Sequence, residues 1–200
     1  MKKITIIIAL LALVTLTGQS QEVKMNEPSF DDYLLLLEQK GYMARSFDFS
    51  MFEGKKARPV IKEYVNGQET RDCMSDFPYL IVFPIEDKIT VGFMPRDVDS
   101  LATCVIDIKG SIRFPLHLKL KSILWGDKPV YHYGTRPFEL VQPFKVGDFI
   151  PLMLYGSYWY DAEDNVTRFC GENFVKPDLS SENLLKGSQH YFVVGIKVEE

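Results

Sequence analysis

The sequence predicts an all-β protein, an antiparallel β-sandwich of the immunoglobulin-like or jelly-roll-like kind with one N-terminal α-helix packed on a sheet. Three observations lead to this class. Short segments of alternating apolar and polar residues recur after residue 42, and turn residues such as Asn66-Gly67 separate them. The uncharged run 149–160 is long enough for a strand that crosses a whole sandwich. One segment near residue 30 has the period of a helix.

The first twenty residues have the features of a secretory signal peptide. Residues 1–3 carry positive charge, residues 4–16 are almost entirely apolar, and Gly18 and Ser20 are small residues before a cleavage point at Gln21. We therefore expect residues 21–200 to form a single exported domain, located in the bacterial periplasm or outside the cell. Because the apolar run is too short to span a bilayer, we expect no transmembrane segment.

The charge of the chain argues against nucleic acid as a partner. The formal net charge is −4, and removal of Lys2 and Lys3 with the signal peptide makes it −6. Phosphate backbones require a concentrated basic face, and the sequence offers none.

The N-terminal helix is expected over about residues 29–40. Ser29 can cap its first turn, with Asp32 three residues later as in a capping box, and Gly41 can end it. Its apolar stripe consists of Phe30, Tyr33, Leu34 and Leu37. A helix of this length is marginal by itself, so we expect it to pack on a sheet.

The later segments are expected to pair as hairpins and to end in a C-terminal strand. The hairpins are 60–65 with 68–71, 78–83 with 89–94, and 101–108 with 111–120, and the last strand is 189–198. Residues 180–183 can start one helical turn.

The uncharged run has two faces with different chemistry, because successive side chains of a strand alternate. One face carries Ile150, Leu152 and Leu154. The other carries Phe149, Met153, Tyr155 and Trp159. We expect the first face to point into the sandwich and the N-terminal helix to cover the second.

Three cysteines, Cys73, Cys104 and Cys170, occur in a chain that we expect to be exported. An oxidising compartment favours one disulfide and one free thiol. Cys104 lies in an apolar strand-like segment, which is typical of a buried thiol. If a bridge forms, we expect it between Cys73 and Cys170, which both lie near polar loop residues.

No catalytic or metal-binding motif stands out. His117, His132 and His190 lack the companions and the spacing of metal sites, and there is no nucleophile elbow. The acidic residues at 161–164 share one turn, whereas carboxylate-based hydrolysis needs two carboxylates that face each other across a cleft. We therefore expect no metal, no cofactor and, in the first instance, no enzymatic activity.

Aromatic residues in turn-rich sequence are the strongest candidate for a binding surface. Trp125 precedes the turn residues 126–129, which include Asp127, and Tyr131 and Tyr133 follow. Planar rings beside polar groups are typical of sugar-binding platforms and protein interfaces. The candidate binding residues are Trp125, Asp127, Tyr131 and Tyr133.

The leading hypothesis is an exported, non-enzymatic binding protein of the cell envelope that recognises a glycan, or another envelope component, through these loop aromatics. Two alternatives remain. One is a structural or protein–protein interaction module, and the other is a hydrolase whose carboxylates are brought together by folding.

Overall fold

The computed structural model describes residues 25, 27–75, 77, 82–95, 100–141, 143–180 and 182–200. The chain divides into two compact units, residues 1–34 and residues 35–200. The predicted signal peptide, residues 1–20, lies outside the described residues. The described part of the first unit holds the start of a helix, and the second unit holds all the described strands.

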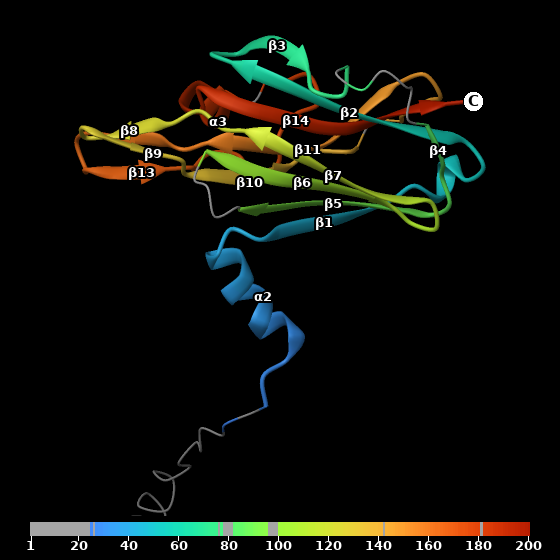
Figure 1. Cartoon of the computed structure of the whole chain (residues 1–200), viewed down its shortest axis with the longest axis horizontal. Helices are drawn as coiled ribbons and strands as arrows, with labels where there is room; N and C mark the ends of the chain where they lie inside the picture. Colours follow the sequence, from blue (N-terminus) through green and yellow to red (C-terminus); the bar gives the residue numbers. More distant parts are fainter. Residues whose placement is uncertain are drawn as a thin grey trace, which may run out of the picture. The chain divides into compact units, whose positions relative to one another are not determined.

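The second unit is a sandwich-like all-β fold built from antiparallel strand pairs (Figure 1). One sheet has the order β1 (Met43–Asp48), β5 (Lys88–Pro95), β6 (Leu101–Ile108) and β7 (Ile112–Lys119). The other has the order β10 (Tyr133–Pro137), β11 (Phe149–Ser157), β14 (His190–Glu199), β2 (Lys56–Val65) and β3 (Gln68–Asp72), and β4 (Phe83–Pro84) also pairs with β2. The predicted fold class is therefore confirmed.

Short elements complete this unit. Two small hairpins are formed by β8 (Ile123–Trp125) with β9 (Lys128–Val130) and by β12 (Trp159–Asp161) with β13 (Val166–Arg168). The helical elements are the 3-10 turn η1 (Ser50–Phe52) and the helix α3 (Glu182–Gly187).

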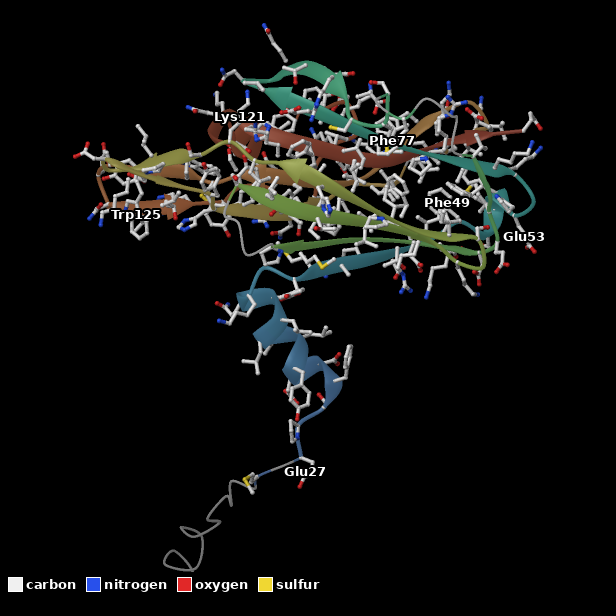
Figure 2. All side chains as sticks on the ribbon, viewed as in Figure 1. Glu27, Phe49, Glu53, Phe77, Lys121 and Trp125 are labelled. Atoms are coloured by element: carbon white, nitrogen blue, oxygen red, sulfur yellow. The ribbon has the colours of Figure 1, made fainter. Side chains whose placement is uncertain are left out.

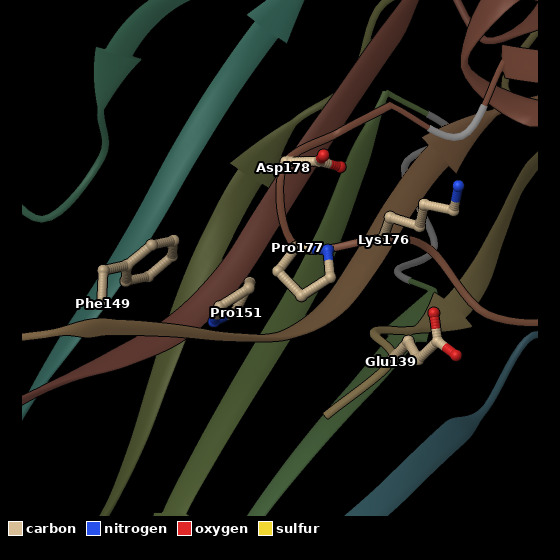
Figure 3. Close-up of a pocket in the computed structure, with 6 residues that line it drawn as sticks. All are labelled: Glu139, Phe149, Pro151, Lys176, Pro177 and Asp178. Atoms are coloured by element: carbon tan, nitrogen blue, oxygen red, sulfur yellow. The ribbon is translucent and has the colours of Figure 1, made fainter. Parts of the chain in front are cut away.

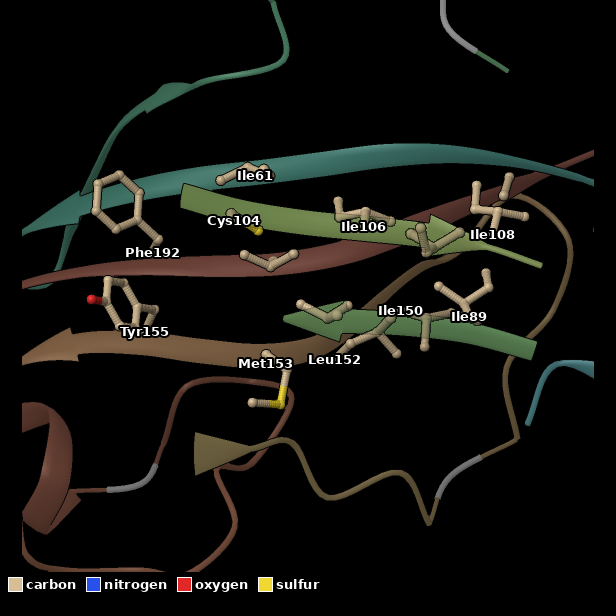
Figure 4. Packing of buried hydrophobic residues seen from close by; sticks show 14 of the residues in the cluster. Ile61, Ile89, Cys104, Ile106, Ile108, Ile150, Leu152, Met153, Tyr155 and Phe192 are labelled. Carbon is tan, nitrogen blue, oxygen red and sulfur yellow. The ribbon is translucent and has the colours of Figure 1, made fainter. Parts of the chain in front are cut away.

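The main core lies between the two sheets (Figure 4). From the first sheet it receives Ile89, Val91, Phe93, Cys104, Ile106 and Ile108. From the second it receives Ile61, Ile150, Leu152, Phe192, Val194 and Ile196. Every second residue of β14 points into this core, as the alternation in the sequence predicts.

A β-bulge in β11 changes the predicted facing of its side chains. The pairing of β11 with β14 shifts register between Pro151 and Met153. Ile150 and Leu152 point into the main core as expected, but beyond the bulge Met153 joins them there, and Leu154 packs on the opposite face. A bulge adds one residue to a strand and so exchanges the two faces after it, which is why the uniform alternation was wrong here.

The long strand is also shorter than predicted. Residue 158 separates β11 from β12. Its backbone N–H donates to the carbonyl of His132 at 2.8 Å, in register with the pairing of β10 and β11. Residues 159–161 then pair with β13 in a separate hairpin.

A second hydrophobic cluster covers the outer face of the six-stranded sheet. Leu154, Tyr191 and Val193 of the sheet pack there with side chains of later segments. Those segments contribute Phe138, Val175 and Leu184, and the last of these belongs to α3. The face that we expected the N-terminal helix to cover is therefore covered by residues 138–187 of the same unit.

The N-terminal helix α2 (Phe30–Gln39) forms where the sequence predicts it. The Asp32 carboxylate accepts hydrogen bonds from the backbone N–H of Ser29 at 2.7 Å and from its hydroxyl at 2.8 Å. None of the ten helical residues is buried. Among the described residues no helix has the length and apolar character needed to cross a bilayer.

The hairpin predictions succeeded where the turn residues were strong. β2 and β3 pair across Asn66 and Gly67, which both have positive φ angles, and β6 and β7 pair across Gly110. The hairpin expected between residues 78–83 and 89–94 is wrong, because β4 pairs with β2 and β5 pairs with β1 and β6. Residues 78–81 lie outside the described chain.

All three cysteines are free, so the structure does not contain the expected bridge between Cys73 and Cys170. Cys73 and Cys104 are buried in the main core, whereas Cys170 is exposed. Burial raises the pKa of the Cys73 thiol to about 11 and also raises that of Cys104. Both are therefore poor nucleophiles in the folded protein.

We expect one thiol per folded chain to react rapidly with dithionitrobenzoate at pH 8, and three to react after unfolding in urea. Cys170 is the exposed thiol, and Cys170→Ser should abolish the rapid phase. A folded wild-type chain with no rapid thiol would contradict this assignment, since it would place Cys170 in a bridge.

Candidate functional site

A hollow of about 390 Å³ lies beside β10 in the second unit, and we call it the aromatic hollow. Six of its lining residues carry rings: Tyr131, His132, Tyr133, Tyr155, Tyr158 and Phe169. Its polar lining residues are Glu38, Gln39, Thr135 and Arg136. A concave site lined mainly by aromatic side chains with a few polar groups is typical of ligand-binding sites.

The structure brings together two of the four predicted binding residues. Tyr131 and Tyr133 both line the aromatic hollow. Trp125 is 42% exposed at the end of β8 and does not line it, but its ring centroid lies 5.9 Å from that of His132, which does (Figure 2). Asp127 is exposed in the β8–β9 turn and is not part of the hollow, so its inclusion in the site is not supported.

Close ring packing fixes the walls of the hollow. Tyr158 and Phe169 are stacked with centroids 5.0 Å apart and an interplanar angle of 11°. Gly134 lies beneath both rings, and a Cβ atom there would come within 2.6 Å of Phe169 Cδ1. No pattern in the sequence indicates the role of Phe169, because this residue reaches the hollow only through the fold.

The hydroxyl of Tyr133 is turned away from the solvent into a polar network. The backbone N–H of Lys121 donates to it at 3.1 Å, and it can donate to the carbonyl of Lys121 at 3.0 Å or to Nδ1 of His190. His190 is 2% exposed, and its Nε2 lies 2.9 Å from Oε1 of Glu63. Arg71 Nε donates to the other carboxylate oxygen of Glu63 at 2.8 Å.

Burial and charge act in opposite directions on this network. Burial lowers the pKa of His190 below its ordinary value, although the Glu63 carboxylate opposes that shift. Burial raises the pKa of the Glu63 carboxyl, but hydrogen bonds and charge from His190 and Arg71 outweigh it, so this pKa is lowered overall. Because both ring nitrogens of His190 have protein partners and the ring is buried, the network positions Tyr133 rather than presenting a base to the hollow.

Arg136 on β10 is the one arginine or lysine among the described residues that line the aromatic hollow. Its Nε donates to the carbonyl of Glu172 at 3.1 Å, Nη1 to that of Thr135 at 3.0 Å, and Nη2 to that of Phe169 at 2.9 Å. The guanidinium carbon also lies 4.8 Å from the centroid of the Phe169 ring. Arg136 has no role that the sequence indicates, because the carbonyls of Phe169 and Glu172 reach it only through the fold.

A second hollow, of about 400 Å³, has two carboxylates in its lining (Figure 3). It is lined by Glu139, Asp178 and Lys176 with Phe149 and two prolines. Hydrogen bonds from Ser180 lower the pKa of Asp178, which suits a carboxylate that stays ionised and not a general acid. The acidic turn at 161–164 is separate from this hollow and is paired with Arg168.

Across the described ranges, no three histidine, cysteine, aspartate or glutamate side chains are grouped so that they could hold a metal ion. The groups that the aromatic hollow offers to a ligand are its aromatic rings, its tyrosine hydroxyls and Arg136.

A family model described as "Domain of unknown function (DUF5041)" matches residues 80–200. The chain belongs to this family. No curated protein and no solved structure matches it. The DUF5041 segment includes all the ring-bearing residues of the aromatic hollow and Arg136, but not Glu38 or Gln39.

The DUF5041 segment does not contain the complete second sheet. Strand β2 precedes residue 80, yet it pairs with β14, β3 and β4. The residues before the matched segment therefore supply a central strand of the fold that positions the site.

Proposed function

We propose that this protein is an exported, non-enzymatic binding protein that recognises a glycan of the cell envelope through the aromatic hollow. The observation that supports this proposal is that six aromatic side chains line one concave site, with polar groups among them. Sugar rings have apolar faces and polar edges, so they are suited to aromatic walls with hydrogen-bonding groups beside them. Export is inferred from the signal-like residues 1–20.

Two hydroxyl groups of the hollow are available to a ligand. Tyr131 and Tyr158 are half-buried, and their hydroxyl groups have no hydrogen-bond partner within the part of the chain that the structure describes. The Tyr133 hydroxyl, in contrast, is fully engaged by Lys121 and His190. Two phenol groups that lack partners at the wall of a hollow can bond to sugar hydroxyls.

A carboxylate-based hydrolase is the second candidate, and the second hollow favours it. Glu139 and Asp178 both line that hollow, and such a mechanism uses two carboxylates at one site. We rank it lower because Asp178 has a lowered pKa and its hollow has a single aromatic ring, that of Phe149. Release of reducing sugar from polysaccharides by the wild type but not by Asp178→Asn would reverse this ranking.

We expect the full chain, expressed and purified, to bind a subset of glycans on an array, and Tyr131→Ala to lower the affinity for them about tenfold through loss of ring contact. Trp125→Ala should have a smaller effect, because Trp125 touches the hollow only through His132.

Phe174→Ala is the matched control, since Phe174 is 57% exposed and does not line either hollow. Equal binding by wild type and Tyr131→Ala would remove the aromatic hollow from the proposal, and the absence of binding to every glycan would overturn the function itself.

A further inference from the structure

The charge of Arg136 has no carboxylate partner among the described residues, although the side chain is half-buried in the aromatic hollow. Its three hydrogen bonds all go to neutral backbone carbonyls. Glu172 supplies one of these carbonyls, but its carboxylate is engaged elsewhere, since it accepts hydrogen bonds from Asn183 and from the backbone N–H of Leu184. A partly desolvated cation without a counter-charge attracts an anion.

The guanidinium also retains donors for a ligand. It has five N–H groups, and the protein engages one on each of its three nitrogens. One N–H on Nη1 and one on Nη2 therefore have no partner among the residues that the structure describes. A carboxylate or a sulfate accepts hydrogen bonds from two guanidinium nitrogens at once, which makes arginine a selective group for such anions.

Arg136 is held in place before any ligand arrives. Its hydrogen bonds connect it to β10 and to residues 169 and 172, and the Phe169 ring packs against its plane. Little side-chain entropy is then lost when the remaining N–H groups bind an anion. A fixed cation beside aromatic walls is suited to a sugar that carries a negative charge.

The acidic residue of the hollow does not cancel this charge. Glu38 Oε1 lies 3.8 Å from Nη1 of Arg45, so this carboxylate has a cation of its own. Its side chain is 45% exposed, and solvent screens it more than the half-buried Arg136.

We propose that the aromatic hollow selects glycans that carry an anionic group, a carboxylate or a sulfate, and that Arg136 binds that group. This inference rests on the proposed glycan-binding function and names its ligand class. The phenol groups of Tyr131 and Tyr158 bond to neutral parts of the same sugar.

The test is an array on which each acidic glycan is paired with an uncharged form of the same backbone. Uronate oligosaccharides are paired with their methyl esters, and sulfated oligosaccharides with their desulfated forms. We expect the full chain to bind the acidic member of a pair at least about tenfold more tightly, as for a charge-assisted hydrogen-bonded pair. The two sets of pairs show whether carboxylate or sulfate is preferred.

Arg136→Gln should reduce this preference to about twofold or less, while Arg113→Gln should leave it unchanged. Arg113→Gln is the matched control because this substitution removes the same charge from an exposed position on β7, outside both hollows. Circular dichroism checks that both variants are folded.

Salt dependence tests the inference without any variant, in case Arg136→Gln does not fold. Raising sodium chloride from about 0.05 M to about 0.5 M should weaken binding of the acidic glycans and leave binding of their neutral forms unchanged.

The outcomes of the array distinguish failure of the role of Arg136 from failure of the glycan-binding function. Equal binding of acidic and neutral members would overturn the role of Arg136 while glycan binding stands. A salt-insensitive preference for acidic members would also overturn it. Binding of no glycan would overturn the proposed function, and this inference with it.

Discussion

Replacement of Gly195 by alanine should lower the free energy of unfolding by about 3 kcal/mol, at the upper end of what overpacking costs. A Cβ atom at this position would come within 2.3 Å of the carbonyl oxygen of Ile150 and 2.6 Å of a ring carbon of Phe149. Gly195 pairs with Pro151 directly beside the bulge of β11. The nearest atom belongs to a backbone, so the clash cannot be relieved by a change of rotamer.

Urea unfolding followed by circular dichroism measures this effect, and Gly92→Ala is the matched control. Gly92 lies in β5 of the other sheet, where an added Cβ would be 3.4 Å from the carbonyl oxygen of Met43. The control should change the free energy of unfolding by less than about 1 kcal/mol. Similar losses for the two variants would mean that the close approach of β11 to β14 is not a special feature of the fold.

His190→Ala should lower the free energy of unfolding by about 3 kcal/mol at pH 7.5, because it removes one hydrogen-bond partner from a partly buried carboxylate and one from a partly buried hydroxyl. Glu63 would keep only Arg71, and Tyr133 would keep only Lys121. The exposed His117 is the matched control, and its replacement by alanine should have little effect.

The same variant should change how stability depends on pH. The pKa of His190 is lowered in the folded state, so below the ordinary value of 6.5 the unfolded chain binds more protons than the folded chain. The contribution of neutral His190 to the free energy of unfolding is therefore fully present above pH 6.5. It is lost as the pH falls toward the pKa of His190 in the folded state. The lowered pKa of Glu63 acts in the same direction, but at lower pH.

Thermal unfolding between pH 5.0 and pH 7.5 checks this expectation. The wild type should lose melting temperature on acidification, and His190→Ala should lose less of it. A pH profile of equal slope in both proteins would contradict the assignment of His190 as a buried neutral group.

Much of the fold follows from local patterns. Alternation of apolar and polar residues predicted β14 and β7, and Asn66-Gly67 predicted the β2–β3 hairpin, because both signals act between residues that are neighbours in the chain. The capped start of α2 was predicted for the same reason.

The candidate site was predicted in part. Tyr131 and Tyr133 were found from aromatic residues in turn-rich sequence, and both line the aromatic hollow. Tyr155 was instead assigned to a face covered by the helix, and Arg136 and Phe169 were given no role. Their contributions arise from strand pairing and from hydrogen bonds between residues more than thirty positions apart.

The sequence by itself determined the all-β class, most of the strands and turns, and the presence of aromatic residues around the turn at residues 125–133. These properties depend on the period and the chemistry of adjacent residues. Only the tertiary structure decided which face each side chain of β11 occupies, because the bulge arises from its pairing with β14. The tertiary structure also decided that the long uncharged strand is core on both faces, and that the aromatic site lies beside it, where β10 and the Phe169 segment meet.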